Sequence, residues 1–407
     1  MARRPRSHRR ALRGRGAAGP AGSHHVTSLY VHIPFCASRC PYCDFATAPA
    51  TSALRARYLA ALRGEIAREG AALGRPRIAT AFFGGGTPSL LDPHEIASLS
   101  DAIREAFDFT PEEVTFEANP ATLDRARLEA WRALGATRMS LGAQSFSQRA
   151  LASLGRTHVP SDIAPAVTAA RSLGMDVNLD LIFGRPDEPD GEWRADLDAA
   201  LEQVPEHVSA YPLELVLEPE EGIANWGGGG WPTVERWRIA AAAAQPDDDG
   251  LADRYELTAD VLRAAGYRHY EIANWAQPGK ECRHNLVYWR NGEWLGVGAG
   301  AHSHLSGRRT RQPGGLLGYL ARVEHELGRI DDAAADPAVD TAILALRLDE
   351  GLDLAAYGAR FGAPARARVD AELRGLDGTG LLERHGDRVV LTDRGRFVAN
   401  EVFVRLL

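Results

Sequence analysis

The sequence has 407 residues, of which 45% are hydrophobic and 25% are charged, and its formal net charge is −7. A chain of this length can bury a large core and predicts two or three domains, whereas its mildly acidic balance excludes a general nucleic-acid binder. No apolar run reaches the ~20 residues that a membrane-spanning helix needs, and four cysteines, three of them clustered, indicate a reducing, cytoplasmic location rather than a disulfide framework.

Residues 1–25 differ from the rest because they are rich in Arg, Ala and Gly and carry no acidic side chain. Such a composition cannot bury a core, so we predict a disordered basic tail. An Arg-rich, acid-poor leader is also typical of a mitochondrial transit peptide. We favour the plain tail, because Arg supplies nearly all the basic charge of the whole chain and Lys280 is its only lysine.

A cysteine loop follows the first predicted strand, 28–33. Cys36, Cys40 and Cys43 stand at the spacing C-x3-C-x2-C, and prolines in and beside the loop break regular structure there. Three thiolates on one short loop can hold three irons of a [4Fe–4S] cluster and leave the fourth iron open for chemistry. A zinc site or a redox thiol pair is the alternative, but structural zinc takes four ligands and the remaining cysteine, Cys282, is far away in sequence. An Asp or a His could complete a zinc shell, so this alternative stays open.

The sequence after the loop alternates between helical and strand-like patterns. Helices are predicted over 51–73, 92–107, 123–134, 161–173 and 192–204. Strands are predicted over 78–83, 113–117, 137–141, 176–183 and 207–211. Together with the first strand they form about six βα units, which predict an α/β fold with a parallel sheet, closed only as a partial (βα)6 barrel over 26–250.

Chemically distinctive residues fall at the carboxyl ends of these strands, the edge where such barrels place their chemistry. They are the cysteine loop, Gly84–Thr87, Glu117, Gln144 and Asp180. Glycines let a backbone approach a ligand closely, and carboxylates can accept hydrogen bonds from ribose hydroxyls or an ammonium group. Taken alone, the glycines are more often just a turn, and the carboxylates are equally typical of solvated strand ends.

The remainder of the chain departs from this alternation. Residues 219–250 are predicted to be a loop or insertion around an Ala-rich helix, and 251–334 an accessory α+β region that begins with a helix over 251–265. From 335 to 407, short helices precede a hairpin over 380–392, which predicts a winged-helix-like module. The acidic balance of the chain favours a packing cap over a nucleic-acid binder for this module.

Four motifs give the chain a specific resemblance. They are Tyr30-Val31-His32-Ile33-Pro34-Phe35-Cys36, Gly84-Gly85-Gly86-Thr87-Pro88-Ser89, Ser140-Leu141-Gly142-Ala143-Gln144-Ser145-Phe146 and Asp180-Leu181-Ile182-Phe183-Gly184. From about residue 28 to its end, the chain resembles the oxygen-independent coproporphyrinogen III oxidase family of radical S-adenosylmethionine (SAM) proteins. The resemblance implies a radical SAM barrel in which SAM chelates the open iron, and in which a reduced cluster cleaves a C–S bond to give a carbon radical.

The resemblance also implies roles for particular residues. Cys36, Cys40 and Cys43 match the cluster ligands of the family, with Tyr42 packed between them. The SAM-contacting positions of the family match Tyr30, Gly85, Gly86, Thr87, Glu117, Gln144, Arg156 and Asp180. One stretch, 214–221, departs from the Glu-Pro-Gly-Thr turn usual in relatives, so local contacts are not carried over there.

Two branches of the family differ just after the third cysteine. The oxidases carry a fourth cysteine two residues later, where this chain has Asp44-Phe45. The heme-chaperone branch, HemW, has C-x3-C-x2-C-D-F and a His-Asn-x-x-Tyr-Trp segment, which this chain matches at 284–289. The closer resemblance to this branch implies a protein that binds heme, the cluster and SAM and delivers heme to respiratory hemoproteins. Oxidative decarboxylation of coproporphyrinogen III is the alternative function, and a metal-binding module without SAM chemistry is a third.

A heme site is predicted at His284, because a neutral imidazole can be an axial ligand of heme iron, while Tyr288 and Trp289 offer flat surface for a porphyrin. Cys282 is a second candidate ligand. On the residues alone, a histidine hydrogen-bonded to backbone is favoured, and the resemblance reverses this preference. As partners we expect heme and acceptor hemoproteins but no nucleic acid. The chain is expected to be a monomer or a homodimer, with a peripheral membrane contact left open.

Overall fold

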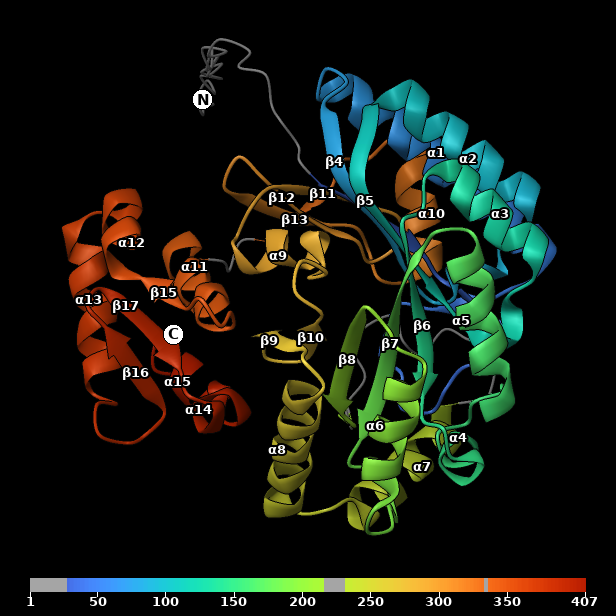
Figure 1. The fold of residues 1–407 in the computed structure, drawn as a ribbon. Helices are drawn as coiled ribbons and strands as arrows, with labels where there is room; N and C mark the ends of the chain where they lie inside the picture. Colours follow the sequence, from blue (N-terminus) through green and yellow to red (C-terminus); the bar gives the residue numbers. More distant parts are fainter. Residues whose placement is uncertain (1–27, 216–230, 333–335) are drawn as a thin grey trace, which may run out of the picture.

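The structure is a computed structural model that describes residues 28–215, 231–332 and 336–407 (Figure 1). The predicted basic tail, 1–25, and most of the stretch 214–221 lie outside the described residues. One twelve-stranded sheet organises the chain, and its strand order is β14-β13-β12-β11-β1-β4-β5-β6-β7-β8-β10-β9.

Six parallel strands at the centre of this sheet confirm the predicted partial (βα)6 barrel. These strands are β1 (Ser28–Ile33), β4 (Arg77–Gly85), β5 (Asp108–Ala118), β6 (Arg138–Gln144), β7 (Asp176–Phe183) and β8 (His207–Pro212). The connecting helices are α1 (Ser52–Ala72), α2 (Pro93–Ala106), α3 (Arg125–Leu134), α4 (Gln148–Ser153), α5 (Ile163–Ser172) and α6 (Glu192–Glu202). Figure 1 shows α1, α2, α3 and α5 along the outer face of the sheet.

The alternation of side chains along the central strands explains this arrangement. On β5, Val114 and Phe116 are fully buried and face the helices, where the Phe116 ring stacks on Trp131 of α3 with a centroid distance of 4.7 Å. The intervening side chains, among them Thr115 and Glu117, point to the opposite face, the barrel interior. The helix-facing side is therefore a dry apolar layer, and the interior is polar enough to receive a ligand.

Helix α2 shows why the local sequence fixes an element where it does. Its N-terminus carries a capping box, in which Asp92 and Glu95 satisfy free backbone N–H groups at the start of the helix, and Pro93 occupies the first turn. Arg55 of α1 pairs with both carboxylates, at 2.7 Å from Asp92 and 2.8 Å from Glu95. The cap therefore also fastens α2 to its neighbouring helix.

The accessory region extends both edges of the barrel sheet. Strand β11 (Trp294–Val297) runs parallel to β1, and β12 (His302–Leu305), β13 (Arg308–Arg311) and β14 (Ile330–Asp331) continue antiparallel. At the other edge, β10 (Asn274–Ala276) pairs with β8, and β9 (Arg268–Glu271) with β10. The helices of this part are α7 (Trp231–Ala244), α8 (Asp248–Ala264), α9 (Arg283–Trp289) and α10 (Leu316–Glu324). Two short strands beside the barrel, β2 (Phe35–Cys36) and β3 (Ala48–Pro49), close the base of the cysteine loop.

The C-terminal module has a hydrophobic core of its own. Its elements are α11 (Pro337–Leu346), β15 (Leu352–Asp353), α12 (Leu354–Phe361), α13 (Ala363–Arg374), β16 (Leu382–His385), β17 (Arg388–Leu391), α14 (Asp393–Phe397) and α15 (Ala399–Phe403). The predicted hairpin is β16–β17, joined by β15 into a three-stranded sheet. The module meets α9 through Arg347, whose guanidinium lies 4.4 Å from the Trp289 ring centroid, and through the pair Arg290–Glu350 at 3.0 Å.

Candidate functional site

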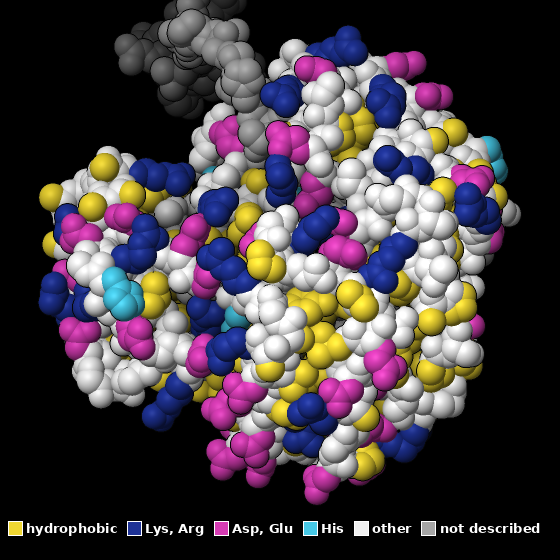
Figure 2. Space-filling model, in the orientation of Figure 1, with side chains coloured by type: hydrophobic (Ala, Val, Ile, Leu, Met, Phe, Trp, Pro, Cys, Tyr) yellow, Lys and Arg dark blue, Asp and Glu magenta, His cyan; other side chains and the backbone are white. Residues whose placement is uncertain are grey.

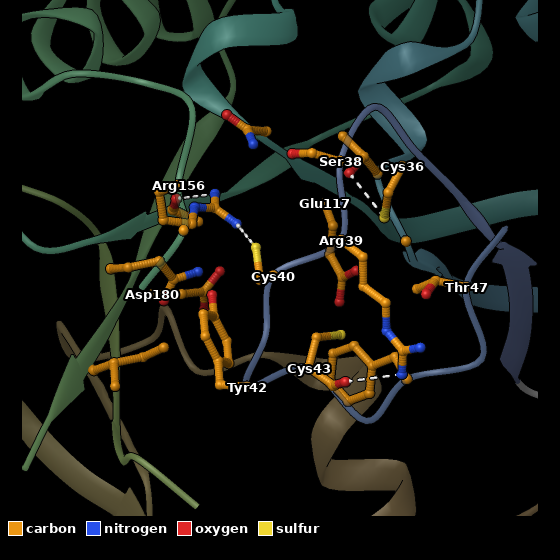
Figure 3. Close-up of a pocket in the computed structure, with 18 of the residues that line it drawn as sticks. Cys36, Ser38, Arg39, Cys40, Tyr42, Cys43, Thr47, Glu117, Arg156 and Asp180 are labelled. Atoms are coloured by element: carbon orange, nitrogen blue, oxygen red, sulfur yellow. Dashed lines mark hydrogen bonds between the residues drawn. The ribbon is translucent and has the colours of Figure 1, made fainter. Parts of the chain in front are cut away.

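A cavity of about 500 Å³ opens at the carboxyl ends of the central strands (Figure 3). Every residue that the sequence assigned to the cluster or to SAM lines this cavity, except Tyr30. Its volume falls in the range of small-molecule sites, roughly 300–1,000 Å³. The fold therefore gathers these side chains, which are spread over 145 positions of sequence from Cys36 to Asp180 counted inclusively, into one pocket.

The three loop cysteines lie half-buried around the opening. Figure 3 shows the sulfur atoms of Cys36, Cys40 and Cys43 at separate points rather than converging on one. Within the described ranges, no group of three or more His, Cys, Asp or Glu side chains is arranged to hold a single metal ion. Ligands spread in this way suit a polynuclear cluster, with one thiolate for each iron, better than a tetrahedral zinc.

Two of these thiols are harder to ionise than an ordinary cysteine. Burial raises the pKa of Cys36 to about 11 and that of Cys43 to about 12. Iron must therefore displace their protons, since the thiolate is the ligand form. Donors to sulfur are already in place, because the Thr87 hydroxyl lies 3.6 Å from Cys36 Sγ and Arg156 Nη1 lies 3.7 Å from Cys40 Sγ. The donor set fits a cluster bound by three cysteines.

The glycine motif joins the cysteine loop to β4. Gly85 has φ +119°, and a Cβ there would lie 2.5 Å from the His32 ring. A Cβ on Gly86 would lie 2.6 Å from the Pro34 carbonyl oxygen, and Gly86 N–H donates to the Ile33 carbonyl at 2.8 Å. These glycines thus allow a close approach between two strands, in addition to any approach to a ligand.

Two sheltered carboxylates face the cavity. Glu117 accepts a hydrogen bond from Gly85 N–H at 2.9 Å, and its pKa is raised to about 8, first by burial and then by the charge of Asp180. Burial also raises the pKa of Asp180, which accepts from Ser140 Oγ at 3.0 Å and from Asn178 Nδ2 at 2.8 Å. Such a pair attracts a cationic group, and the sulfonium and ammonium of SAM are both cationic.

We expect SAM affinity to rise with pH up to about pH 8 and then to level off. At neutral pH the raised pKa keeps Glu117 mostly protonated, and a cationic ligand favours the ionised form, so binding must release this proton. The affinity should change by at most about tenfold per pH unit. The check is anaerobic equilibrium dialysis of SAM between pH 6.5 and 9. The Glu117→Gln variant should bind SAM more weakly at pH 8.5, and its SAM affinity should no longer depend on pH. If the affinity of this variant still rises with pH, another group titrates.

Gln144 occupies a strained turn at the end of β6. Its φ is +63°, a left-handed conformation that is uncommon for a residue with a side chain. The carbonyl groups of the two residues before Gln144 are both hydrogen-bonded. Arg156 donates to the Gly142 carbonyl at 2.8 Å, and His158 bonds the Ala143 carbonyl at 3.0 Å. On the other side, Asp196 of α6 accepts bonds from the two residues after Gln144. The turn is thus fixed by Arg156, which the sequence assigned to SAM, and by His158 and Asp196, which it did not single out.

Tyr30 and His284 lie away from the cavity lining. The Tyr30 hydroxyl meets His32 Nδ1 at 3.0 Å. The His284 side chain is 0% exposed, and its two ring nitrogens meet Thr80 Oγ1 at 3.0 Å and the Tyr288 hydroxyl at 2.7 Å. Burial lowers the pKa of His284 to about 3, so the imidazole is neutral. The predicted heme ligand therefore does not line the cavity that gathers the predicted cluster ligands and, except for Tyr30, the predicted SAM residues.

The other candidate ligand, Cys282, begins helix α9. Burial raises the pKa of its thiol to about 12, and Sγ donates to Glu113 Oε1 at 3.4 Å. The same carboxylate accepts the backbone N–H groups of Arg283 at 3.1 Å and His284 at 3.0 Å. Glu113 of β5 thereby caps the N-terminus of α9 and anchors this helix to the barrel.

Comparisons with known proteins agree with this geometry. Residues 30–200 match the radical SAM superfamily, and residues 333–398 match the HemN C-terminal domain. The chain is 42% identical to the heme chaperone HemW of Mycobacterium tuberculosis, and this alignment covers 93% of this chain and 94% of that protein. It is 31% identical to HemW of Bacillus subtilis, and this alignment covers 93% of this chain and 98% of that protein. The crystal structure of coproporphyrinogen III oxidase (HemN) from Escherichia coli superposes with a TM-score of 0.81 at 22% identity, covering 95% of this chain and 91% of that one. At that identity the likeness concerns the fold.

Proposed function

This chain belongs to the HemW-like heme chaperone family of radical SAM proteins, and from that membership we propose that it binds heme, a [4Fe–4S] cluster and SAM, and delivers the heme to respiratory hemoproteins. The observation that carries the proposal is the coverage of its relatives, because proteins named heme chaperones align over nearly the whole chain. Phe45 adds to it, since the resembling oxidases carry a fourth cysteine at this position.

The cavity residues would divide the work of holding the two small cofactors. Cys36, Cys40 and Cys43 would hold the cluster, and Glu117 and Asp180 would neutralise the cationic groups of SAM. When bound together, the reduced cluster and SAM supply one-electron chemistry that protein side chains lack.

Anaerobic reconstitution followed by three assays tests the proposal. Titration with heme should give a saturable complex, and incubation with coproporphyrinogen III, SAM and a reductant should give no decarboxylated product. Transfer of the heme to a separately prepared apo-hemoprotein should follow. Turnover of coproporphyrinogen III would instead establish the oxidase, and absence of both heme binding and turnover would contradict the proposal.

Heme ligation by His284 requires helix α9 to rearrange, since both ring nitrogens are engaged. We expect His284→Ala to weaken heme binding by about tenfold or more, because an axial ligand is lost. Tyr288→Phe should strengthen it by roughly fivefold, since one hydrogen bond of ~1 kcal/mol no longer holds the imidazole in place. The measurement is the Soret absorbance during heme titration. Unchanged affinity in His284→Ala, with a native circular dichroism spectrum, would remove His284 as the ligand.

We propose that the protein acts in the cytoplasm. We also propose that the C-terminal module serves as a packing cap rather than as a nucleic-acid binder. On the face shown in Figure 2, acidic and basic side chains are interspersed over this module rather than gathered into a basic field. None of the helices in the described residues is long and apolar enough to cross a bilayer. A gel-shift assay with duplex DNA should show no specific complex. A specific complex would contradict the proposal that the C-terminal module is only a packing cap.

A further inference from the structure

Helix α7 packs against the cysteine loop, although the sequence placed it within an insertion. Two adjacent side chains make this contact. Trp237 packs on a small apolar cluster of Leu154, Ile182 and Leu213, which Tyr42 of the loop also joins. The next residue, Arg238, is 0% exposed.

The Arg238 guanidinium binds the backbone of the loop. Its Nε donates to the Pro41 carbonyl at 2.7 Å, and its Nη2 donates to the Cys43 carbonyl at 2.9 Å. Arg39 also donates to the Cys43 carbonyl, at 3.3 Å. The two carbonyls bound by Arg238 belong to the residues on either side of Tyr42, so a side chain from a distant helix helps to fix the turn that spaces the second and third cysteines.

Apart from the Arg39 contact, few backbone hydrogen bonds stabilise the loop from within. From Cys36 to Thr47, a stretch described throughout, one backbone hydrogen bond joins two loop residues, Cys43 N–H to the Cys40 carbonyl at 3.1 Å. The β2–β3 pairing secures only its base. Thiolates bound to iron bring negative charge into this loop, and a buried guanidinium beside it offsets that charge.

We propose that Arg238 is a positioning residue for the cluster: it holds the loop so that the three thiolates reach their irons, and its charge sets how firmly the reduced cluster is retained. This inference rests on the cluster assigned above. Outer partners of metal ligands typically change metal affinity 10–100-fold, and charge and hydrogen bonding near the sulfurs set the reduction potential.

The test compares Arg238→Met and Arg238→Lys with wild type and with Arg194→Met, which removes an exposed guanidinium on α6. After anaerobic reconstitution, three quantities are measured: iron and sulfide per chain, the half-time of cluster absorbance in the presence of a chelator, and the midpoint potential by electron paramagnetic resonance. Wild type and Arg194→Met should hold about four irons. Arg238→Met should lose its cluster about tenfold faster and show a more negative potential, and Arg238→Lys should fall between.

Equal half-times and potentials in Arg238→Met and wild type would overturn the proposal. Circular dichroism of the apo-proteins checks folding. If Arg238→Met does not fold, the half-time of cluster loss and the midpoint potential of Arg238→Lys test the proposal instead. A wild-type protein without iron would overturn the cluster assignment itself, whereas a normal wild-type cluster with unaffected variants overturns the role of Arg238 alone.

Discussion

Cys40→Ser should reduce the iron content of the anaerobically reconstituted protein from about four atoms per chain to near zero. A cube held by three cysteines has no spare ligand, and serine oxygen is a poor substitute for a thiolate with iron–sulfur clusters. Cys40 Sγ also accepts a hydrogen bond from Arg156 Nη1, so the substitution removes the sulfur partner of this guanidinium. The measurement is iron and sulfide analysis together with the broad visible absorbance of the cluster.

Cys282→Ser is the matched control for this prediction. Its thiol is more deeply buried than those of the loop, lies at the start of α9 and bonds Glu113 rather than lining the cavity. This variant should keep about four irons. The zinc alternative would be established by the opposite pattern, in which wild type returns one zinc and no sulfide, and Cys40→Ser loses that zinc.

The core of the fold could be predicted because its signals are local. Each central strand alternates apolar residues toward the helices with polar residues toward the interior, and each helix carries a stripe that covers the strands. The edges of the sheet gave no comparable signal. Strand β11 has four residues, and its parallel partner β1 lies more than 250 positions earlier in the sequence, so pattern alone cannot pair them.

Some residues of the candidate site could likewise be predicted from the sequence, and others could not. The cysteine loop, Gly84–Thr87 and Glu117 could be predicted because chemistry restricts which residue types serve there. Arg238 and Asp196 could not, since an Arg on an Ala-rich helix and an Asp within α6 are ordinary surface patterns until the tertiary fold buries them. His284 shows the converse, because its motif resembled a ligand site whereas the side chain is enclosed among hydrogen-bond partners.

Arg185→Met should destabilise the protein by about 3–5 kcal/mol, the range for removing one partner of a buried ion pair. Arg185 is 0% exposed and pairs with Asp196 at 2.8 Å, Glu192 at 3.2 Å and Glu188 at 3.2 Å. Without it, Arg254 of α8 and the backbone N–H of residue 185 remain as partners of Glu188, and the buried Asp196 loses its ion-pair partner. Burial already raises the pKa of Asp196, so the ionised form would become still less favourable.

The consequence reaches the cavity, because Asp196 is also the acceptor that fixes the turn after Gln144. We therefore expect Arg185→Met to weaken SAM binding as well as to lower the urea midpoint of unfolding. Arg149→Met is the control, since Arg149 is 45% exposed and pairs with Glu192 at 2.6 Å, and it should cost less than about 1 kcal/mol. Because both substitutions remove a guanidinium from Glu192, a difference between them isolates the buried contacts to Asp196 and Glu188. Equal urea midpoints in the two variants would show that this network does not add to stability, and equal SAM affinities would show that it does not fix the Gln144 turn.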